Sequence, residues 1–420
     1  PHDLWDCLSN HREVGRSLWD RQSLIVDLDV EYVNFDQPAL PFVQPKNCYQ
    51  LQSPVVAATQ QWLTEHHVAP LHWISGQGHH FAWKVDRHSE AFGQLAQLGH
   101  LTESLYYRYR CPSALNSSPV GLETGSAFSG LGMVLEFVAQ ELKKRRQHET
   151  RIPIALTAVE AGPVRKSTNV NREIISLDIS EYGDPLDTRG VRMPFSVYLK
   201  PSQKRYQLGD SFVDAMPPIF PIPLFEMDVS TAIDVMRDSK RVMELAGRVS
   251  TTIPDYSHQM LGIIEDYKAS RLSDFHTAFY QERHDEPASW PATYDQTPLN
   301  ALPSCVRQPL ERPNDLLLKP AVIQHVTRTL MAHDWSPRHV AGLIRSKYER
   351  DFGWGERWYR YDAASRADFY VRLFAGSIVA GYDQLTDFNC VSTQEKHYCP
   401  EVNCGSNLVD LRNILREKHQ

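Results

Sequence analysis

Two aspartates separated by one residue, Asp27 and Asp29, end a short apolar run that begins at Leu24. The run predicts a β-strand, and because side chains alternate along a strand, both carboxylates project from the same face. Adjacent carboxylates repel each other unless a cation lies between them, and such oxygen ligands suit Mg2+ or Mn2+. The pair therefore indicates a metal site for phosphoryl or nucleotidyl transfer, although Asp-X-Asp also occurs at solvated strand ends.

A glycine-rich turn follows one helix later, in the sequence Ser75-Gly76-Gln77-Gly78-His79-His80. Glycines in a tight turn let backbone amides approach an anion, and a histidine on the returning strand can donate to a phosphate oxygen. We expect Ser75, Gly76, Gly78 and His80 to bind phosphate and His79 to face the other side of the strand. A purely structural hairpin is the alternative.

Asp178 supplies a third carboxylate, at the end of the apolar run 173–178. With Asp27 and Asp29 it would complete a site for two metal ions, one activating the attacking hydroxyl and the other holding a triphosphate.

The run 192–200 carries cations and hydroxyl groups at alternate positions. If it is a strand, Arg192, Ser196, Tyr198 and Lys200 share one face, where they suit a triphosphate. For any one of these residues, a solvated strand face is the alternative.

The remaining pattern predicts the elements that position these residues. Strands are expected over 24–29, 71–74, 80–85, 173–178 and 195–200, and helices over roughly 8–22, 53–67, 126–147, 228–248, 258–284, 322–333, 337–352 and 364–382. Strands interleaved with two helices predict an open sheet, and the prolines over 214–225 predict an extended exit from this domain. We therefore expect an α+β protein, with a catalytic domain at 1–225, a helical linker region at 226–300 and a mainly helical domain at 301–420.

Composition agrees with folded globular domains. The chain has 420 residues, of which 42% are hydrophobic and 10% aromatic, so two or three domains are expected. No run approaches the roughly 20 apolar residues of a membrane span, and the first residues lack a signal-peptide pattern. The net charge of -7 does not by itself indicate a nucleic-acid-binding protein. Because the sequence begins with Pro1 and not Met, we expect a trimmed or excised chain.

Seven cysteines in a chain without a secretion signal argue against a disulfide framework. Cys7, Cys48 and Cys111 are scattered, and we interpret them as ordinary buried or half-buried thiols.

Taken in order, the three motifs resemble those of the archaeo-eukaryotic primase and primase-polymerase superfamily: an Asp-X-Asp strand, a Ser-Gly-X-Gly-X-His turn and a later strand Asp. The resemblance implies that Asp27, Asp29 and Asp178 are catalytic metal ligands on a fold akin to an RNA-recognition motif (RRM). It also implies that His80 belongs to the triphosphate site.

Small catalytic subunits of this family also carry an Arg-X-Pro-Gly-Ser-Leu-His-X-Lys stretch, to which 192–200 is similar. Phe195 stands in place of the glycine and Tyr198 in place of the histidine. The resemblance implies that Arg192, Ser196 and Lys200 grip the incoming triphosphate.

The last third is similar to the C-terminal domain of primase large subunits. The sequence 302–307 resembles its Pro-Pro-Cys entry, and His325 and Arg328 are spaced like its His-X-X-Arg pair. The resemblance implies a 4Fe-4S cluster held by one distant and three late cysteines, here Cys305, Cys390, Cys399 and Cys404. A compact zinc site of Cys390, His397, Cys399 and Cys404 is the alternative, and it leaves Cys305 without a role. Cationic side chains expected to contact the template or the initiating 5'-triphosphate are His325, Arg328, Arg345, Lys347 and Arg350.

We therefore expect a DNA-template-directed primase-polymerase, a nucleotidyltransferase that starts chains de novo from NTPs or dNTPs on single-stranded DNA. Its expected cofactors are Mg2+ or Mn2+ and the 4Fe-4S cluster. We expect it in the cytoplasm, associated with the nucleoid, with a helicase or other replication proteins as partners and no membrane contact.

Two other classes of function remain open. A haloacid-dehalogenase-type phosphatase also opens on an Asp-X-Asp strand and uses the first Asp as nucleophile, but here Val30-Glu31-Tyr32 follows in place of its usual Thr or Val and Gly. A non-catalytic nucleic-acid-binding module is disfavoured because all three carboxylates and His80 are present.

Overall fold

The structure is a computed structural model that describes residues 12–110, 121–146, 149–157, 159, 172–183, 190–355, 358 and 361–419. At its centre is the 12-residue strand β2 (Ser23–Asn34). Its side chains at even positions, Leu24, Val26, Leu28, Val30 and Tyr32, are buried in the apolar core. This alternation, typical of a strand with one face on the core, leaves the odd positions on the opposite face.

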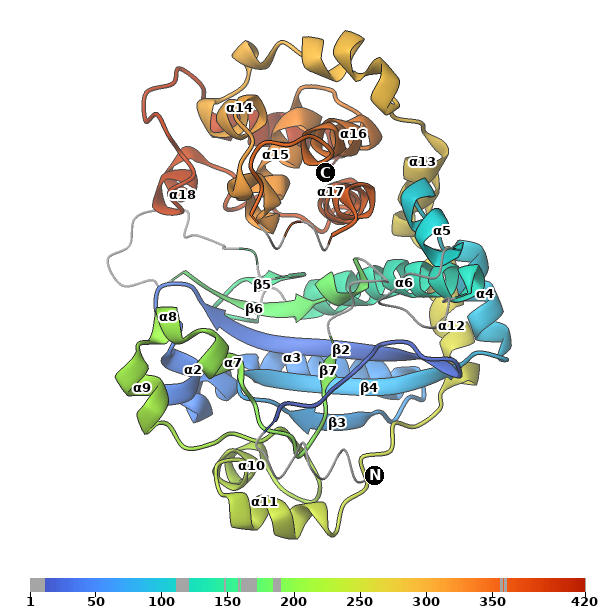
Figure 1. Ribbon diagram of the computed structural model, residues 1–420, viewed down its shortest axis with the longest axis vertical. Coiled ribbons are helices and arrows are strands. Elements are labelled where there is room, and N and C mark those ends of the chain that lie inside the picture. Colours follow the sequence, from blue (N-terminus) through green and yellow to red (C-terminus); the bar gives the residue numbers. More distant parts are fainter. Residues whose placement is uncertain are drawn as a thin grey trace.

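The described strands form a six-stranded sheet in the order β5-β6-β2-β4-β3-β8. β2 pairs in antiparallel fashion with both of its neighbours, β4 (Gly78–Asp86) and β6 (Glu173–Asp178). The only parallel pair among these strands joins β6 to β5 (Ile154–Ala155). β3 (Leu71–Ile74) and β8 (Ile222–Pro223) complete the other edge. A separate antiparallel ribbon of β1 (Gly15–Arg16) and β7 (Val191–Arg192) overlies the sheet (Figure 1).

Helix α3 (Pro45–Glu65) packs on β2, and α6 (Leu122–Arg146) packs on α3, α4 (Glu90–Leu98) and α12 (Ser257–Lys268). α6 is buried on nearly all sides, as expected of a helix enclosed by other elements. Its Glu136 carboxylate contacts both His276 Nε2 and Arg372 Nε at 3.1 Å. α6 therefore joins the sheet to the helices that follow, and one apolar core extends from Leu18 to Leu415.

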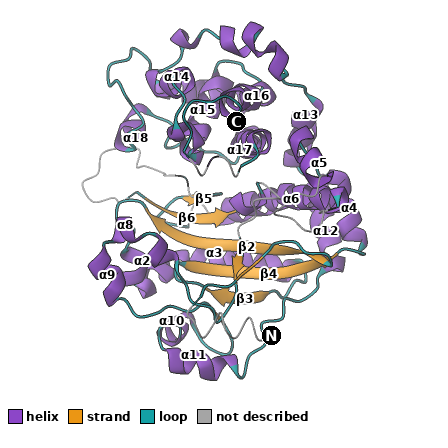
Figure 2. Ribbon diagram, in the orientation of Figure 1, coloured by secondary structure: helices purple, strands orange, loops and turns teal. Residues whose placement is uncertain are grey.

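The strands lie in the lower half of the molecule and the later helices in the upper half (Figure 2). The helices of the upper half are α13 (Arg271–Gln281), α14 (Ser304–Glu311), α15 (Pro320–Ala332), α16 (Pro337–Tyr348), α17 (Ala363–Val379), α18 (Cys390–Glu395) and α19 (Leu408–His419). The expectation of an α+β protein is confirmed. Within the described residues, no helix is both long and apolar enough to cross a membrane.

Shorter elements connect these parts. They are α2 (Leu40–Val43), α5 (Glu103–Arg110), α7 (Lys200–Gln203), α8 (Arg205–Leu208), α9 (Asp210–Ala215), α10 (Val229–Val235) and α11 (Ser239–Ala246), with 3-10 turns η1 (Ser180–Tyr182), η2 (Pro287–Ala292), η3 (Tyr294–Gln296), η4 (Leu299–Ala301) and η5 (Asp315–Leu318). In the segment 226–300, α10 packs on α3, α12 on α4 and α13 on α17.

Several local predictions were wrong. The helices expected over 228–248 and 258–284 are each divided in two, into α10 and α11 and into α12 and α13. The helix expected over 8–22 is replaced at 12–22 by β1 and a bridge between Trp19 and Leu24, while residues 8–11 lie outside the described part. The helix expected at 53–67 begins earlier, because Pro45 occupies its first turn and Pro54 lies in its interior.

The strand expected over 195–200 does not form. Phe195 has φ +70°, in the left-handed region that interrupts an extended chain, and α7 begins at Lys200. Pro201 in the first turn of α7 favours this helical start, since proline there loses no helical hydrogen bond.

Candidate active site

Three carboxylates converge across neighbouring strands. Asp27 and Asp29 lie on the same face of β2, and Asp29 is opposite Asp178 of β6 in the strand register. On the other side of β2, Asp29 is opposite His80 of β4. The Asp pair thus lies in the middle of β2, not at the end of a strand as expected, and both neighbouring strands can contribute side chains to it.

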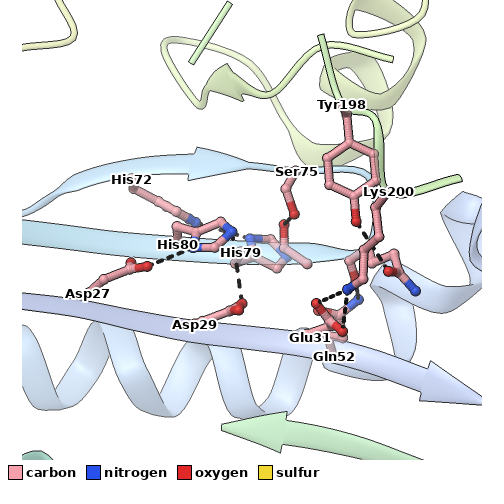
Figure 3. A network of polar contacts seen from close by, with 12 residues as sticks. Asp27, Asp29, Glu31, Gln52, His72, Ser75, His79, His80, Tyr198 and Lys200 are labelled. Carbon is pink, nitrogen blue, oxygen red and sulfur yellow. Dashed lines mark hydrogen bonds and ion pairs between the residues drawn. The ribbon is translucent and has the colours of Figure 1, made fainter. Parts of the chain in front are cut away.

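His80 contacts the carboxylates of Asp27 and Asp29 (Figure 3). Its Nδ1 is 3.0 Å from Asp27 Oδ2 and its Nε2 is 3.9 Å from Asp29 Oδ1. The imidazole is 5% exposed and stacks on the Trp73 ring with centroids 4.9 Å apart. Burial lowers the pKa of His80, but the charges of Asp29 and Asp27 prevail and raise it to about 9. His80 therefore holds the carboxylates in place in this structure.

Asp29 is held in an environment that disfavours its charge. Burial first, and then the charges of Glu31, Asp27 and Asp178, raise the pKa of Asp29 from 3.8 to about 8, against the opposing effect of His80. The Oδ1 atoms of Asp27 and Asp29 are buried and accept no hydrogen bond within the described part of the chain. Unpaired buried carboxylate oxygens are costly unless a cation or donor binds them, so these atoms fit a divalent cation.

The carboxylates are not yet arranged as a closed coordination shell. Among the described residues, no group of three or more His, Cys, Asp or Glu side chains is placed to hold a metal ion. Asp178 is half-buried, and its Oδ1 accepts a hydrogen bond from the Ser180 amide at 2.9 Å. Metal binding at this site therefore belongs to the proposal below.

Two further acidic residues border the site. Glu31 continues the alternation of Asp27 and Asp29 along β2, a signal that the sequence already contained. Glu181, in turn η1, is close enough to Asp27, Asp29 and Asp178 that burial and these charges hold its pKa well above the ordinary value. Its only sequence signal is its position three residues after Asp178.

The turn after Asp178 also completes the backbone of the site. β6 ends at Asp178, so the Asp27 amide has no strand partner on that side. Asp27 N instead donates to the Tyr182 hydroxyl oxygen at 2.8 Å. This contact satisfies a buried donor next to the catalytic candidates.

The glycine-rich turn is buried, and packing explains both of its glycines. A Cβ at position 76 would collide with the Tyr198 ring, and one at position 78 would collide with the backbone of Val30 and Glu31. The Tyr198 hydroxyl donates to Gln77 Oε1 at 3.1 Å. Tyr198 thus covers the turn that was expected to present its amides to phosphate.

The two histidines that follow this turn lie on opposite faces of β4, as strand alternation predicts. His79 Nδ1 is 3.0 Å from His72 Nε2, and its ring packs against Tyr49 of α3, away from the carboxylates. Ser75 is 4% exposed, and its amide donates to the Gly78 carbonyl at 2.8 Å.

Because the strand expected over 195–200 does not form, its polar side chains do not line up on one strand face. The Ser196 hydroxyl is buried and donates to the Met193 carbonyl at 2.8 Å. Arg192 Nε is 2.6 Å from Glu13 Oε1, and its guanidinium lies over the Tyr198 ring. Lys200 Nζ contacts both carboxylate oxygens of Glu31 at 2.7 Å. The structure therefore brings Arg192, Tyr198 and Lys200 to one end of the carboxylate row.

The four late cysteines gather in the helical half as free thiols. Burial, and then the charges of Cys399, Cys390 and Cys404, raise the pKa of Cys305 to about 12. Cys305 Sγ is also 3.1 Å from His325 Nε2. The thiols are near one another but form no metal-binding group among the described residues. Of the scattered cysteines, Cys48 is buried, while Cys7 and Cys111 lie outside the described part.

Three of the cations expected to contact nucleic acid in the helical half have carboxylate partners. Arg328 is buried and ion-paired with Asp383 at 2.8 Å and with Asp387 at 2.9 Å. Arg345 pairs with Glu349 at 2.6 Å and Arg350 with Asp295 at 2.6 Å, while Lys347 is 8% exposed.

Comparisons with protein-family models, curated proteins and solved structures find no match. The resemblance to primase-polymerases therefore rests on the sequence motifs alone.

Proposed function

We propose that this protein is a primase-polymerase that synthesises primers de novo by metal-dependent nucleotidyl transfer from NTPs or dNTPs on a single-stranded DNA template. One observation carries the proposal. Asp178, about 150 residues after Asp27 and Asp29, lies on the strand next to theirs, and the Oδ1 atoms of Asp27 and Asp29 are buried with no hydrogen-bond donor among the described residues. In this proposal the sheet with its covering helices is the RRM-like catalytic domain.

The carboxylates would hold Mg2+ or Mn2+, with Asp27 Oδ1 and Asp29 Oδ1 as the first ligands and Asp178 as the third. When bound, the ions activate the attacking 3'-hydroxyl and neutralise charge on the triphosphate. The chain's own contribution is orientation. His80 fixes Asp27 through a 3.0 Å contact, and Trp73 fixes the His80 ring by stacking.

Arg192 and Lys200 supply the positive charge for a triphosphate at the Glu31 end of the row. The Arg192 guanidinium lies over the Tyr198 ring, which packs on the glycine-rich turn, and Lys200 contacts Glu31. A guanidinium and an ammonium that flank a carboxylate-bound metal are suited to a triphosphate with its cation.

The helical half contributes the second part of the proposal. Cys305, Cys390, Cys399 and Cys404 would hold a 4Fe-4S cluster after closing on it, with zinc as the alternative at the three late cysteines and His397. His325, beside Cys305, and Arg328 would then lie next to the cluster instead of on an exposed template track. Binding of single-stranded DNA, of the initiating 5'-triphosphate and of replication partners belongs to this proposal.

The phosphatase alternative gains nothing from the geometry. Its nucleophile would be Asp27, which is 1% exposed, is held by His80 and lies in the interior of β2. A nucleophile must reach the phosphorus atom of its substrate.

Primer synthesis tests the proposal. The protein is incubated with Mg2+ or Mn2+, labelled NTPs or dNTPs and unprimed single-stranded DNA, beside Asp29→Asn and Asp178→Asn variants. Asp234→Asn is the matched control, because Asp234 is exposed and pairs with the exposed Lys46. We expect oligonucleotides from the wild type and control and none from the two site variants. No product from the wild type, or undiminished product from the site variants, would overturn the proposal.

A separate preparation tests the cluster. Protein purified without oxygen should show a broad visible absorbance band that Cys305→Ser abolishes. Stoichiometric zinc without colour would instead establish the zinc alternative.

A further inference from the structure

Glu31 is the third carboxylate on the face of β2 that carries Asp27 and Asp29, and it lies two residues beyond Asp29. Its two oxygens are each 2.7 Å from Lys200 Nζ. The side chains of Glu31 and Lys200 are 20% and 15% exposed, so the pair is largely shielded from water. In this structure the ammonium expected to hold a triphosphate is therefore neutralised by a carboxylate of the protein.

Arg192 shows the same arrangement. Its Nε is 2.6 Å from Glu13 Oε1, and the same oxygen accepts the Leu199 amide at 3.1 Å. The side chains of Arg192 and Glu13 are 27% and 19% exposed. Both cations at this end of the site thus have an anionic partner from a distant part of the chain.

We propose that Glu31 and Glu13 act as internal substitutes for phosphate, which hold Lys200 and Arg192 until a nucleoside triphosphate displaces them. This inference rests on the proposed function and adds the basis of its ligand specificity. To bind, a ligand must replace two shielded, charge-assisted ion pairs at once. A triphosphate has enough charge and length to contact both cations. A diphosphate or monophosphate replaces only part of the two ion pairs that are broken.

Glu31 also has a second cation nearby when it leaves Lys200. The charge of Lys204, one helical turn further along, acts on the Glu31 carboxylate together with that of Lys200. Lys204 thus adds to the positive charge around the Glu31 carboxylate at this end of the site.

Equilibrium binding of ATP, ADP and AMP tests this inference without turnover. Titration calorimetry with Ca2+ present would compare the wild type with Glu31→Gln, Glu31→Asp and the matched control Glu65→Gln. Glu65 forms an exposed ion pair with Arg145, at the far ends of α3 and α6. Unfolding temperatures of all four proteins would confirm that each is folded.

Without the Glu31 charge, Lys200 is open to phosphate. Binding should therefore strengthen most for ADP and AMP, which displace Glu31 less well than ATP does. We expect Glu31→Gln to bind ADP about tenfold more tightly and ATP only a few-fold more tightly, so that the preference for ATP shrinks. Glu31→Asp, which keeps the charge, and Glu65→Gln should retain the wild-type preference.

An unchanged ratio of ATP to ADP affinity in Glu31→Gln, or weaker binding of both, would overturn this inference alone, since wild-type ATP binding would still support the nucleotide site. Absence of nucleotide binding by both the wild type and Glu31→Gln would overturn the inference together with the proposed function.

Discussion

Replacing Asp29 with asparagine removes a buried titratable carboxyl group but keeps the shape of the side chain. Because the pKa of Asp29 rises from 3.8 to about 8 on folding, the folded protein retains a proton that the unfolded chain releases near pH 4. A group with a raised carboxyl pKa contributes stability at low pH and loses it as the pH rises toward the folded value. From pH 5 to pH 8 this loss spans about three pH units at about 1.4 kcal/mol each, or about 4 kcal/mol.

The Asp29→Asn variant has no such titration, so its stability relative to the wild type should increase by about 3 to 4 kcal/mol between pH 5 and pH 8. His80 adds to this difference in the same direction. Its raised pKa, which costs the wild type stability as the pH rises, falls when its largest favourable charge is removed. The difference in free energy of unfolding is measured by urea titration in the presence of EDTA, with tryptophan fluorescence as the signal. The matched control is Asp234→Asn, whose exposed ion pair should give a difference that hardly depends on pH.

Added Mn2+ should stabilise the wild type relative to Asp29→Asn at pH 8, since a cation that binds only the folded wild type raises its free energy of unfolding, and more so the tighter it binds. If wild type and Asp29→Asn differ by the same amount at pH 5 and pH 8, the Asp29 carboxyl does not lie in the environment described above. The electrostatic argument for a cation at Asp27 and Asp29 would then be refuted.

Three other substitutions test packing around the site and in the helical half. At Phe195, where φ is +70°, Phe195→Gly should be about 1 kcal/mol more stable than Phe195→Ala in thermal unfolding, the reverse of the usual order, because glycine adopts this conformation without strain. Gly76→Ala should cost about 1 to 3 kcal/mol in the same measurement by displacing the Tyr198 ring, while Gly93→Ala, with open space in α4, should be neutral or stabilising. Arg328→Met should lower the free energy of unfolding by about 3 to 5 kcal/mol in urea titrations, because it takes the guanidinium from the buried Asp383 carboxylate and from Asp387, which keeps Lys396; a loss below about 1 kcal/mol would contradict this role.

The strand positions and side-chain faces that the sequence predicted correctly depend on local geometry. Strand alternation places Asp27 and Asp29 on one face and separates His80 from His79, and β3, β4 and β6 form where their apolar runs predict them. Glu31 follows from the same alternation, but nothing in the local sequence shows that it would pair with Lys200, 169 residues away.

The segment 192–200 shows where local reasoning fails. Its alternation of polar and apolar residues fits a strand, yet the chain turns at Phe195, where the Phe195 amide bonds to Pro221 and the Tyr198 amide to Ile219. These contacts come from residues more than 20 positions away, so tertiary contacts overrode the local pattern. The glycine-rich turn is a similar case, since its glycines make room for Tyr198 as well as allowing the turn.

The sequence by itself determined the α+β class, most strand and helix positions, and the candidate carboxylates, because these depend on periodicities of two and 3.6 residues. Only the tertiary structure decided which charges meet. It placed Asp178 and His80 on either side of Asp29, paired Lys200 with Glu31 and Arg192 with Glu13, and buried Arg328 between two aspartates. Strand register and long-range packing set these contacts, and no residue spacing encodes them.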